Sequence, residues 1–417
     1  MSRIKIFVSS LATAVLIGVP LARAAEPTGA ISLREAIALA LGQNPELVAY
    51  ANDAGVSDAR LVQAALRPSP EVSFTAEDFG GSGEFQGTDS LQSTFQLTQV
   101  LELGGKRAAR IRAAEAGKPI IELEYEVRRL RVATETARAF IDLLGAQERL
   151  ALARETLALT ETVVPVLQRR IEAGRSSTAE AMRARVAVTS AQIVVGKEEG
   201  QVDLARARLA AQWGSTTPQF REASGNLELT PELPTLSALR ELVERHPNLA
   251  RALADGDQRA AQVAVEESKA VPNVTLSGGF RRLNDPSENV WTFAVGIPLP
   301  LLNRNQGSIS EARLLALRAK SEARAIEVNL NTELAITYES LEDARIELTL
   351  LRSSVLPELQ KALDLTNDGY LNGRFSYLEL TETRRALAEA RSQYLQALVN
   401  YQKAAAALRA FTGDLIQ

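Results

Sequence analysis

The chain has 417 residues, 47 of them Lys or Arg and 51 Asp or Glu, which gives a formal net charge of −4. This balance argues against a nucleic-acid partner, because nucleic acids are bound mainly through clustered positive charge. The absence of cysteine excludes disulfides, thiolate metal sites and cysteine nucleophiles. The single histidine, His246, stands directly before a proline and is interpreted as a helix-boundary residue. We expect neither an enzyme nor a cofactor, since no nucleophile, base and orienting group form a candidate set.

The N-terminus has the pattern of an export signal, over residues 1–24. Two basic residues, Arg3 and Lys5, precede an apolar run over 6–19, and Ala22-Arg23-Ala24 supplies a small-x-small cleavage site. The apolar run is shorter than the roughly 20 residues that a membrane-spanning helix needs. We expect an exported mature chain that carries no lipid on an N-terminal cysteine.

The mature chain consists of two structural repeats, over 25–226 and 227–417, which share sequence landmarks and the order of their elements. Asn44-Pro45-Glu46-Leu47 recurs as His246-Pro247-Asn248-Leu249, and other landmarks recur at nearly the same interval of about 200 residues. A period of this length indicates a duplicated unit and not a short-period solenoid. Each repeat reads as short helices, two strands, a very long helix, a tight turn and a second long helix.

Within each repeat, two segments alternate apolar and polar residues with the period of a strand. In the first of them, Val72, Phe74 and Ala76 alternate with Ser73 and Thr75. Each segment is near the roughly ten residues of a tilted strand that crosses a bilayer. The expected strands are about 70–79, 90–101, 272–282 and 289–299.

Four strands are too few to close a membrane barrel, because the smallest such barrels use about eight. An open sheet in lipid would leave backbone groups unpaired along its edges, at a cost of several kcal/mol each. We therefore expect several subunits to contribute four strands each to one barrel. The alternative is a soluble antiparallel sheet that covers the helices.

The remaining segments show heptad patterning, which is typical of long helices in coiled coils. We expect the prolines at 119, 165 and 357 to kink these helices. Apolar or small residues recur in steps of four and three, as in the series Leu330, Leu334, Thr337, Leu341, Ala344, Leu348 and Leu351.

Two glycine turns are expected to form the tips of the helical hairpins, near 174 and 373. After each turn a helix restarts with the spacing of a capping box, in which a serine precedes a glutamate by three residues. Arginine follows glycine at both tips. The tips are interpreted either as docking sites for another protein or as plain hairpin loops. The docking interpretation rests on Gly174, Arg175, Gly373 and Arg374.

The mature chain resembles outer-membrane efflux proteins of the TolC family, from Ser32-Leu33-Arg34-Glu35-Ala36 through both strand pairs and both tips. Two loops are similar to those of the CzcC-like heavy-metal branch: Glu102-Leu103-Gly104-Gly105-Lys106-Arg107, and the stretch over 295–306 that contains Pro298-Leu299-Pro300-Leu301-Leu302.

The resemblance implies a mainly α-helical fold with a transmembrane β-barrel contribution. In a homotrimer, three sets of four strands would form one 12-stranded barrel in outer-membrane lipid, and the hairpins would form an α-barrel tunnel in the periplasm. The tips would dock on a periplasmic adaptor (a membrane fusion protein) that links the channel to an inner-membrane RND-type pump. Such channels are passive, and heavy-metal cations are the expected cargo.

The resemblance also implies a periplasmic constriction on the inner helix pair, formed by Tyr370, Glu379 and Glu382. Positions three apart share a helix face, so threefold symmetry would give two rings of carboxylates that favour cations. Crowding in such rings predicts a raised carboxylate pKa or a bound divalent cation. The alternative is that both glutamates are solvated residues of a first helical turn, where the helix dipole favours them.

Two further functions remain open from the sequence. An exported coiled-coil interaction protein, such as a periplasmic adaptor or a surface stalk, would account for the signal and the heptads. It would not account for the duplicated strand pairs. A TolC-like channel for drugs or secreted proteins would share every feature above and differ only in its cargo.

Overall fold

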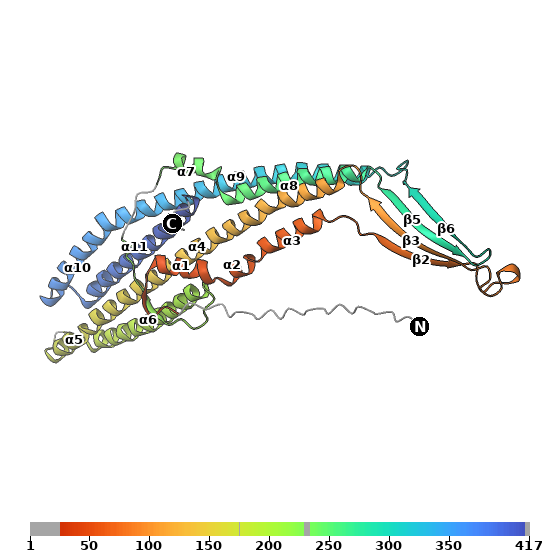
Figure 1. The fold of residues 1–417 in the computed structure, drawn as a ribbon. Coiled ribbons are helices and arrows are strands. Elements are labelled where there is room, and N and C mark those ends of the chain that lie inside the picture. The colour runs from red at the N-terminus through yellow and green to blue at the C-terminus, as the bar shows by residue number, and fades with distance from the viewer. Residues whose placement is uncertain (1–25, 175, 229–233, 413–417) are drawn as a thin grey trace.

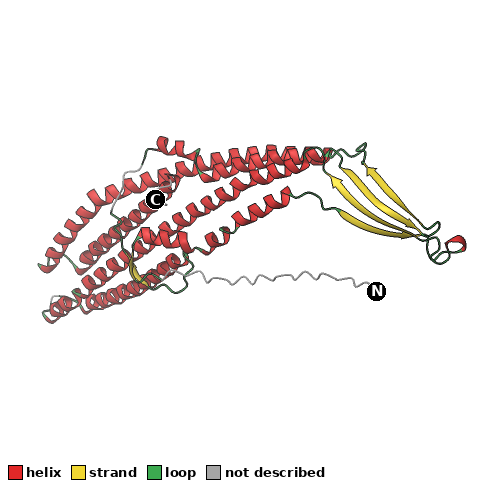
Figure 2. Ribbon diagram, viewed as in Figure 1, coloured by secondary structure: helices red, strands yellow, loops and turns green. Residues whose placement is uncertain are grey.

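The computed structural model describes residues 26–174, 176–228 and 234–412. The predicted export signal, residues 1–24, and the predicted docking residue Arg175 lie outside these ranges. The molecule is elongated, with a β-sheet at one end and the turns of two helical hairpins at the other (Figure 1). Helices make up most of the fold (Figure 2), which confirms the predicted class of mainly α structure with a β contribution.

The first repeat begins with short elements and continues into a strand pair and a long hairpin. The elements are β1 (Gly29–Ile31), α1 (Leu33–Gln43), α2 (Pro45–Tyr50), α3 (Asp53–Ala65), β2 (Glu71–Glu77), the 3₁₀ turn Gly83–Phe85, β3 (Gln92–Leu101), α4 (Lys106–Glu161), α5 (Val163–Glu172), α6 (Thr178–Ala211) and β4 (Phe220–Ala223).

The second repeat follows the same order. Its elements are α7 (Leu236–Val243), α8 (Pro247–Lys269), β5 (Val274–Leu283), β6 (Glu288–Gly296), α9 (Gln306–Leu350), α10 (Leu356–Leu371) and α11 (Tyr377–Thr412). Strands β1 and β4 pair in parallel, whereas β2, β3, β5 and β6 form an antiparallel sheet in that order. The strand pairs of the two repeats are therefore joined through β3 and β5.

Equivalent residues cap equivalent helices in the two repeats. The side-chain oxygen of Asn44 accepts from the backbone N–H of Glu46 at the start of α2, and Nδ1 of His246 accepts from Asn248 at the start of α8. Each cap also contacts the end of the last helix of its own repeat: Nδ2 of Asn44 donates to the carbonyl of Gln212, the C-cap of α6, while the His246 ring packs against Phe411 of α11. The interpretation of His246 as a helix-boundary residue is confirmed.

The core lies between the long helices, and the predicted heptad positions supply it. The apolar heptad residues of α9 are all buried, as are Leu380, Leu387, Tyr401 and Leu408 of α11. Small residues such as Ala344, Ala390 and Ala397 are buried beside them. None of the described helices contains a stretch both long and apolar enough to cross a membrane.

The three prolines expected to kink the long helices behave differently. Pro119 lies inside the unbroken helix α4. Helix α4 ends at Glu161, and α5 begins at Val163 shortly before Pro165. Before Pro357 the chain forms a π-helical turn, Leu351–Val355, because proline has no N–H to donate to the carbonyl four residues back.

Candidate functional site

The described sheet has one apolar face and one polar face, as its register shows. Phe74 is opposite Phe95, Phe95 is opposite Phe280, and Phe280 is opposite Trp291, so four aromatic side chains form one row across all four strands of the sheet. Neighbouring ring centroids in this row are 4.7, 5.5 and 6.4 Å apart. The same face carries Val72, Leu97, Leu101, Leu276, Phe293 and Val295.

This apolar face is exposed in the single chain. Val72 is 75% exposed, Phe293 76% and Trp291 86%. Soluble monomers rarely leave so large an apolar patch in contact with water. A row of aromatic rings along an outward apolar face is typical of a barrel in a membrane.

The opposite face of the sheet carries hydroxyl, amide and charged side chains. Arg281 donates from Nε to Thr94 Oγ1 at 3.0 Å and from Nη1 to Gln92 Oε1 at 3.1 Å. Its Nη2 lies 3.8 Å from a carboxylate oxygen of Glu77. The hydroxyls of Thr98 and Ser277 are 3.1 Å apart. This face is suited to a water-filled lumen.

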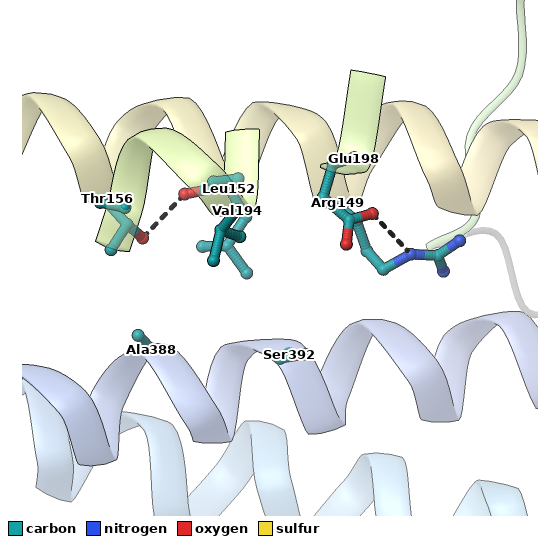
Figure 3. Close-up of a pocket in the computed structure, with 9 residues that line it drawn as sticks. Arg149, Leu152, Thr156, Val194, Glu198, Ala388 and Ser392 are labelled. Atoms are coloured by element: carbon teal, nitrogen blue, oxygen red, sulfur yellow. Dashed lines mark hydrogen bonds and ion pairs between the residues drawn. The ribbon is translucent and has the colours of Figure 1, made fainter. Parts of the chain in front are cut away.

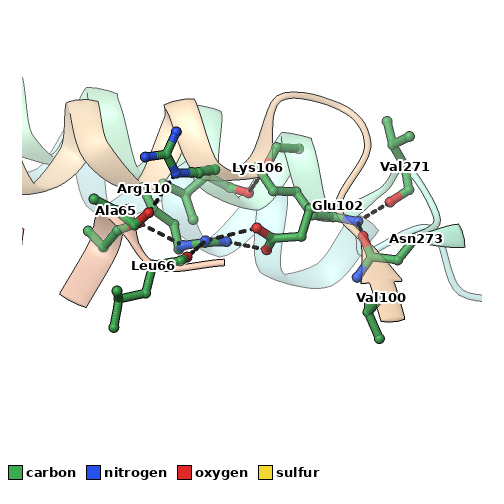
Figure 4. Close-up of polar contacts among 12 residues, drawn as sticks. Ala65, Leu66, Val100, Glu102, Lys106, Arg110, Val271 and Asn273 are labelled. Carbon is green, nitrogen blue, oxygen red and sulfur yellow. Dashed lines mark hydrogen bonds and ion pairs between the residues drawn. The ribbon is translucent and has the colours of Figure 1, made fainter. Parts of the chain in front are cut away.

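Where strand β3 turns into helix α4, basic side chains of the first helical turn tie neighbouring segments together (Figure 4). Arg107 Nε donates to the Ala65 carbonyl at 2.6 Å, and Arg110 Nη2 donates to the Leu66 carbonyl at 3.0 Å. Arg110 is also paired with both carboxylate oxygens of Glu102. Lys106 Nζ donates to the Val271 carbonyl and to Asn273 Oδ1, in the segment that leads to β5. The first turn of α4 thus fixes the end of α3 and the start of β5 relative to the sheet.

Two glycines permit this turn. Gly104 has φ +69°, and a Cβ there would lie 2.6 Å from the Cβ of Val271. Gly105 is the N-cap of α4, also in the left-handed region, with open space around its Cα. In the second repeat the equivalent N-cap of α9 is Asn305, with φ +59°. Asparagine tolerates this conformation better than most residues that carry a Cβ.

At the opposite end of the molecule, Gly373 closes the tip of the second hairpin. Its φ is +77°, and the next N–H, that of Arg374, donates to the Gly369 carbonyl at 2.7 Å. Gly174 closes the first tip, with φ +70°. A residue in the left-handed region after a helix end is the usual stop of an α-helix, and glycine adopts that conformation without a Cβ penalty.

Helix α11 starts with a complete capping box. The backbone N–H and the hydroxyl of Ser376 both donate to Glu379 Oε2, at 2.7 and 2.8 Å, while the N–H of Glu379 donates back to Ser376 Oγ. These hydrogen bonds lower the pKa of Glu379 from its usual value. Glu382, one turn further along, is exposed. Within one subunit, therefore, the Glu379 pKa moves in the direction opposite to that expected from crowding in a ring.

Near the tips, the two hairpins are tied together by arginines. Arg170 of α5 donates from Nη1 to the Tyr370 carbonyl of α10 at 2.7 Å, and its guanidinium lies 4.6 Å from the centre of the Tyr370 ring. Arg384 of α11 donates from Nη1 to the Leu159 carbonyl of α4 at 3.2 Å. Around these ties lies a small apolar cluster from both hairpins: Val163, Leu167, Ala184, Tyr370, Tyr377 and Leu380.

Burial within this cluster shifts the titration of its polar groups. It raises the pKa of Tyr370 and of Tyr377, and it lowers the pKa of Arg384. Both phenols therefore remain neutral at physiological pH and act as packing groups. The Tyr370 contact that joins the hairpins is made by its ring and its carbonyl oxygen, and the hydroxyl does not make it.

On the side of the tip cluster that faces the sheet, cavities separate the hairpins. One cavity of about 210 Å³ lies between α4, α6 and α11, where Leu152 and Val194 face the short side chains of Ala388 and Ser392 (Figure 3). An ion pair of Arg149 with Glu198, at 3.5 Å, lies at its edge. A second cavity, of about 220 Å³, lies nearer the tips and is lined in part by Arg384 and Arg391. The interface between the hairpins therefore contains cavities between the tip cluster and the main core, where Arg391 of α11 also pairs with Glu155 of α4 at 2.8 Å.

The structure places the predicted Gly174 and Gly373 in the two turns, Tyr370 at the contact between the hairpins, and Glu379 and Glu382 at the start of α11, whereas the sequence did not indicate Arg170 or Arg384. Local sequence gives little sign of their role, because Arg170 follows another arginine and its partner lies 200 residues away. Among the described residues, no group of three or more His, Asp or Glu side chains is placed to hold a metal ion.

The sequence matches the family model "Outer membrane efflux protein" over residues 36–215 and 238–414, one match in each repeat. It is 32% identical to the cobalt-zinc-cadmium resistance protein CzcC of Cupriavidus metallidurans, over 93% of this chain and 91% of that protein. It is 28% identical to the nickel-cobalt-cadmium resistance protein NccC of Alcaligenes xylosoxydans xylosoxydans, over 76% and 71% of the two chains.

The fold is similar to those of solved outer-membrane channels. A crystal structure of CusC superposes with a TM-score of 0.78 at 18% identity, covering 92% of this chain and 93% of that one. The outer membrane protein VceC of Vibrio cholerae superposes with a TM-score of 0.72 at 19% identity, covering 92% and 94%. These findings confirm the predicted resemblance to the TolC family and its CzcC-type branch. The chain belongs to the outer membrane efflux protein family and is an outer-membrane efflux protein, not an enzyme.

Proposed function

We propose that this protein is the passive outer-membrane exit channel of a tripartite efflux system, and that it exports heavy-metal cations. The names of the two relatives above support the cargo, since one is a cobalt-zinc-cadmium and the other a nickel-cobalt-cadmium resistance protein. The apolar face of the sheet supports a position in the bilayer, and the polar face supports a water-filled lumen.

The observation that carries the proposal is that the subunit has matching open edges at every level. In the sheet, β2 and β6 are the edge strands. Among the helices next to the sheet, the order of contacts is α3, α4, α8, α9. Near the tips the order is α6, α4, α11, then α9 and α10. One edge always belongs to the first repeat and the other to the second. A single rotation therefore places complementary edges together along the whole length of the molecule.

Exposed apolar residues on the edge helices support such an assembly. Met182, Val186 and Ile193 of α6 are 64, 66 and 68% exposed, and Leu314 and Ile336 of α9 are 64 and 62% exposed. Packing α6 of one subunit against α10 and the later part of α9 of the next would cover the α6 residues and Ile336, and packing α3 against the start of α9 would cover Leu314. Such burial favours association by about 25 cal/mol per Å² of apolar surface removed from water. Three subunits would supply the 12 strands of one closed barrel.

We further propose that the tips form the periplasmic gate. The Arg170 and Arg384 ties hold the hairpins together in the resting state, and the cavities above them leave room for the hairpins to move apart. Glu379 and Glu382, repeated by threefold symmetry, would line the constriction and favour cations. The capping hydrogen bonds lower the pKa of Glu379 within each subunit, and this opposes the rise in pKa that crowding in a ring would cause.

The same tips are the proposed docking site for the periplasmic adaptor, which would connect the channel to an inner-membrane RND-type pump. Gly174 and Gly373 fix the shape of the two turns, and Arg175 and Arg374 follow them directly. Valine at position 373 would be disfavoured at a positive φ, so it should distort the docking turn without touching the sheet.

A deletion strain tests this function. Growth on cobalt, zinc and cadmium should be restored by the wild-type gene and not by Gly373→Val, whereas outer-membrane yield and oligomeric state should be equal for the two proteins. Adaptor crosslinking should be lost together with resistance. Restoration of drug resistance or protein secretion in place of metal resistance would show that the cargo is wrong, and equal crosslinking by both proteins would show that the docking site is wrong.

A further inference from the structure

The apolar row of strand β6 continues beyond the end of the strand. Trp291, Phe293 and Val295 alternate along the apolar face, and β6 ends at Gly296. The alternation then persists through Ile297, Leu299 and Leu301, which are 51, 74 and 73% exposed, and Leu302 is 92% exposed. So many large apolar side chains in an irregular segment need an occupant other than water.

Part of the backbone of this segment either needs no hydrogen-bond partner or finds one within the segment. Pro298 and Pro300 have no N–H to satisfy. The N–H of Leu301 donates to the Leu299 carbonyl at 2.8 Å. Such pairing matters in a bilayer, where an unpaired backbone group costs several kcal/mol.

The polar residues that follow the segment also fold back on it. Nε of Arg304 donates to the Pro300 carbonyl at 3.3 Å, and Nε2 of Gln306 donates to the Leu302 carbonyl at 3.4 Å. Nδ2 of Asn305 donates to the carbonyl and to a carboxylate oxygen of Glu266 in α8, at 2.8 and 3.0 Å. The apolar segment is thereby anchored to the helical part of the molecule at its polar end.

The connection between the last strand and the long helix differs in the first repeat. There the chain passes from β3 into α4 through Gly104 and Gly105, and Gly104 packs against Val271. No proline stands between Leu101 and Lys106. The exposed Pro-Leu-Pro-Leu-Leu segment is therefore an addition specific to the second repeat, and the duplicated architecture does not require it.

We infer that residues 297–302 form an apolar strap that inserts among the acyl chains of the periplasmic leaflet of the outer membrane. The inference rests on the proposed function, because it requires the sheet to belong to a barrel in that membrane. The strap would extend the lipid contact of the protein beyond the strands, into a segment without regular secondary structure.

The length of the apolar row supports this occupant. From Trp291 to Val295 the strand rises only about 13 Å, which a tilt of about 40° reduces to roughly 10 Å along the membrane normal. The apolar band of a membrane barrel is about 25 Å tall. A fully extended chain from Trp291 to Leu301 would rise at most about 33 Å, or roughly 25 Å along the normal, and the turn at Leu301 shortens this span. With the strap, the apolar row reaches across more of the bilayer than the strand alone.

The chain contains no cysteine, so single cysteines can be labelled without background. A nitroxide is attached to Leu299→Cys, Leu301→Cys and Leu302→Cys in the full-length protein, which is reconstituted in phospholipid vesicles. Collision rates with oxygen, which concentrates in lipid, and with a water-soluble nickel chelate are measured by electron paramagnetic resonance. Phe293→Cys on the apolar face of β6 and Thr292→Cys on its polar face are the matched controls.

We expect all three strap labels to behave like the Phe293→Cys label, with several-fold faster oxygen collisions and several-fold slower nickel collisions than the Thr292→Cys label. Nickel access at the strap equal to that at Thr292→Cys would place it in water and overturn the inference. Slow collisions with both reagents would place the strap against another subunit and overturn it as well. Nickel access at Phe293→Cys itself would overturn the proposed barrel, and with it the strap.

Discussion

The guanidinium of Arg170 covers the ring of Tyr370 and donates a 2.7 Å hydrogen bond to its carbonyl oxygen, although the two residues are 200 positions apart in the chain. The contact joins the tip of the first hairpin to that of the second. Cation–π contact and a charge-assisted hydrogen bond act together there, in a place partly shielded from water. The hairpins can separate only if both are broken.

Replacing Arg170 with alanine should therefore favour the open channel. Loss of a contribution of about 1.4 kcal/mol would change the open–closed equilibrium roughly tenfold. Single-channel recording in planar bilayers should show more frequent or longer open periods. The matched control is Arg169→Ala, because Arg169 is exposed and its Nε donates within its own helix to the Pro165 carbonyl. Equal gating by the two variants would contradict the tie.

The glutamates at the start of α11 can be neutralised without loss of the helix cap. Glutamine at position 379 keeps the capping-box hydrogen bonds, since Gln serves in that position as well as Glu. The double variant Glu379→Gln, Glu382→Gln should weaken the block of current by divalent cations and lower cation selectivity. Glu389→Gln, on the same helix but further from the tip, should change neither property. If divalent cations blocked the double variant as strongly as the wild type, both glutamates would be solvated helix residues with no part in the constriction.

The two glycines between β3 and α4 should differ sharply in their tolerance of alanine. Both have positive φ, which costs alanine roughly 1 kcal/mol. A Cβ at Gly104 would in addition overlap Val271, whereas a Cβ at Gly105 meets no atom within 4 Å. We expect Gly104→Ala to reduce the yield of assembled protein in the outer membrane much more than Gly105→Ala. Similar yields would mean that the packing of Gly104 on Val271 does not matter for assembly.

His246 gives a pH dependence that can be isolated, because it is the only histidine in the chain. Burial lowers its pKa in the folded protein, whereas an unfolded histidine titrates near 6.5. The neutral ring is thus favoured in the folded state. Its contribution to stability is complete above about pH 6.5 and is lost as the pH falls through the lower folded-state pKa.

Variants of His246 separate this pH effect from its capping role. His246→Asn should keep the cap, as Asn44 does in the first repeat, and should flatten the pH dependence of thermal unfolding between about pH 7.5 and 5.5. His246→Ala should lose the cap, at a cost of about 1 kcal/mol at neutral pH. Melting followed by helical circular dichroism checks both. An Asn variant that remains as acid-sensitive as the wild type would disprove the assignment.

The sequence was most informative where one physical rule acts locally. Strand alternation indicated the apolar face that carries Phe74 and Phe95, heptads indicated the buried positions of α9, and the Ser376 and Glu379 spacing indicated the cap. Contacts between distant segments were not accessible in this way. The partner of Arg170 depends on how two hairpins pack, and the π-helical turn depends on how α9 and α10 accommodate Pro357.

Subunit assembly is the central claim of this account, because the barrel, the gate and the strap all depend on it. Native mass measurement of the mature protein, purified from outer membranes in detergent, tests it most directly. The matching edges and the need for more than four strands to close a barrel predict an oligomer, and the resemblance to the TolC family implies three copies. A monomer, or a complex whose copy number differs from three, would contradict the account.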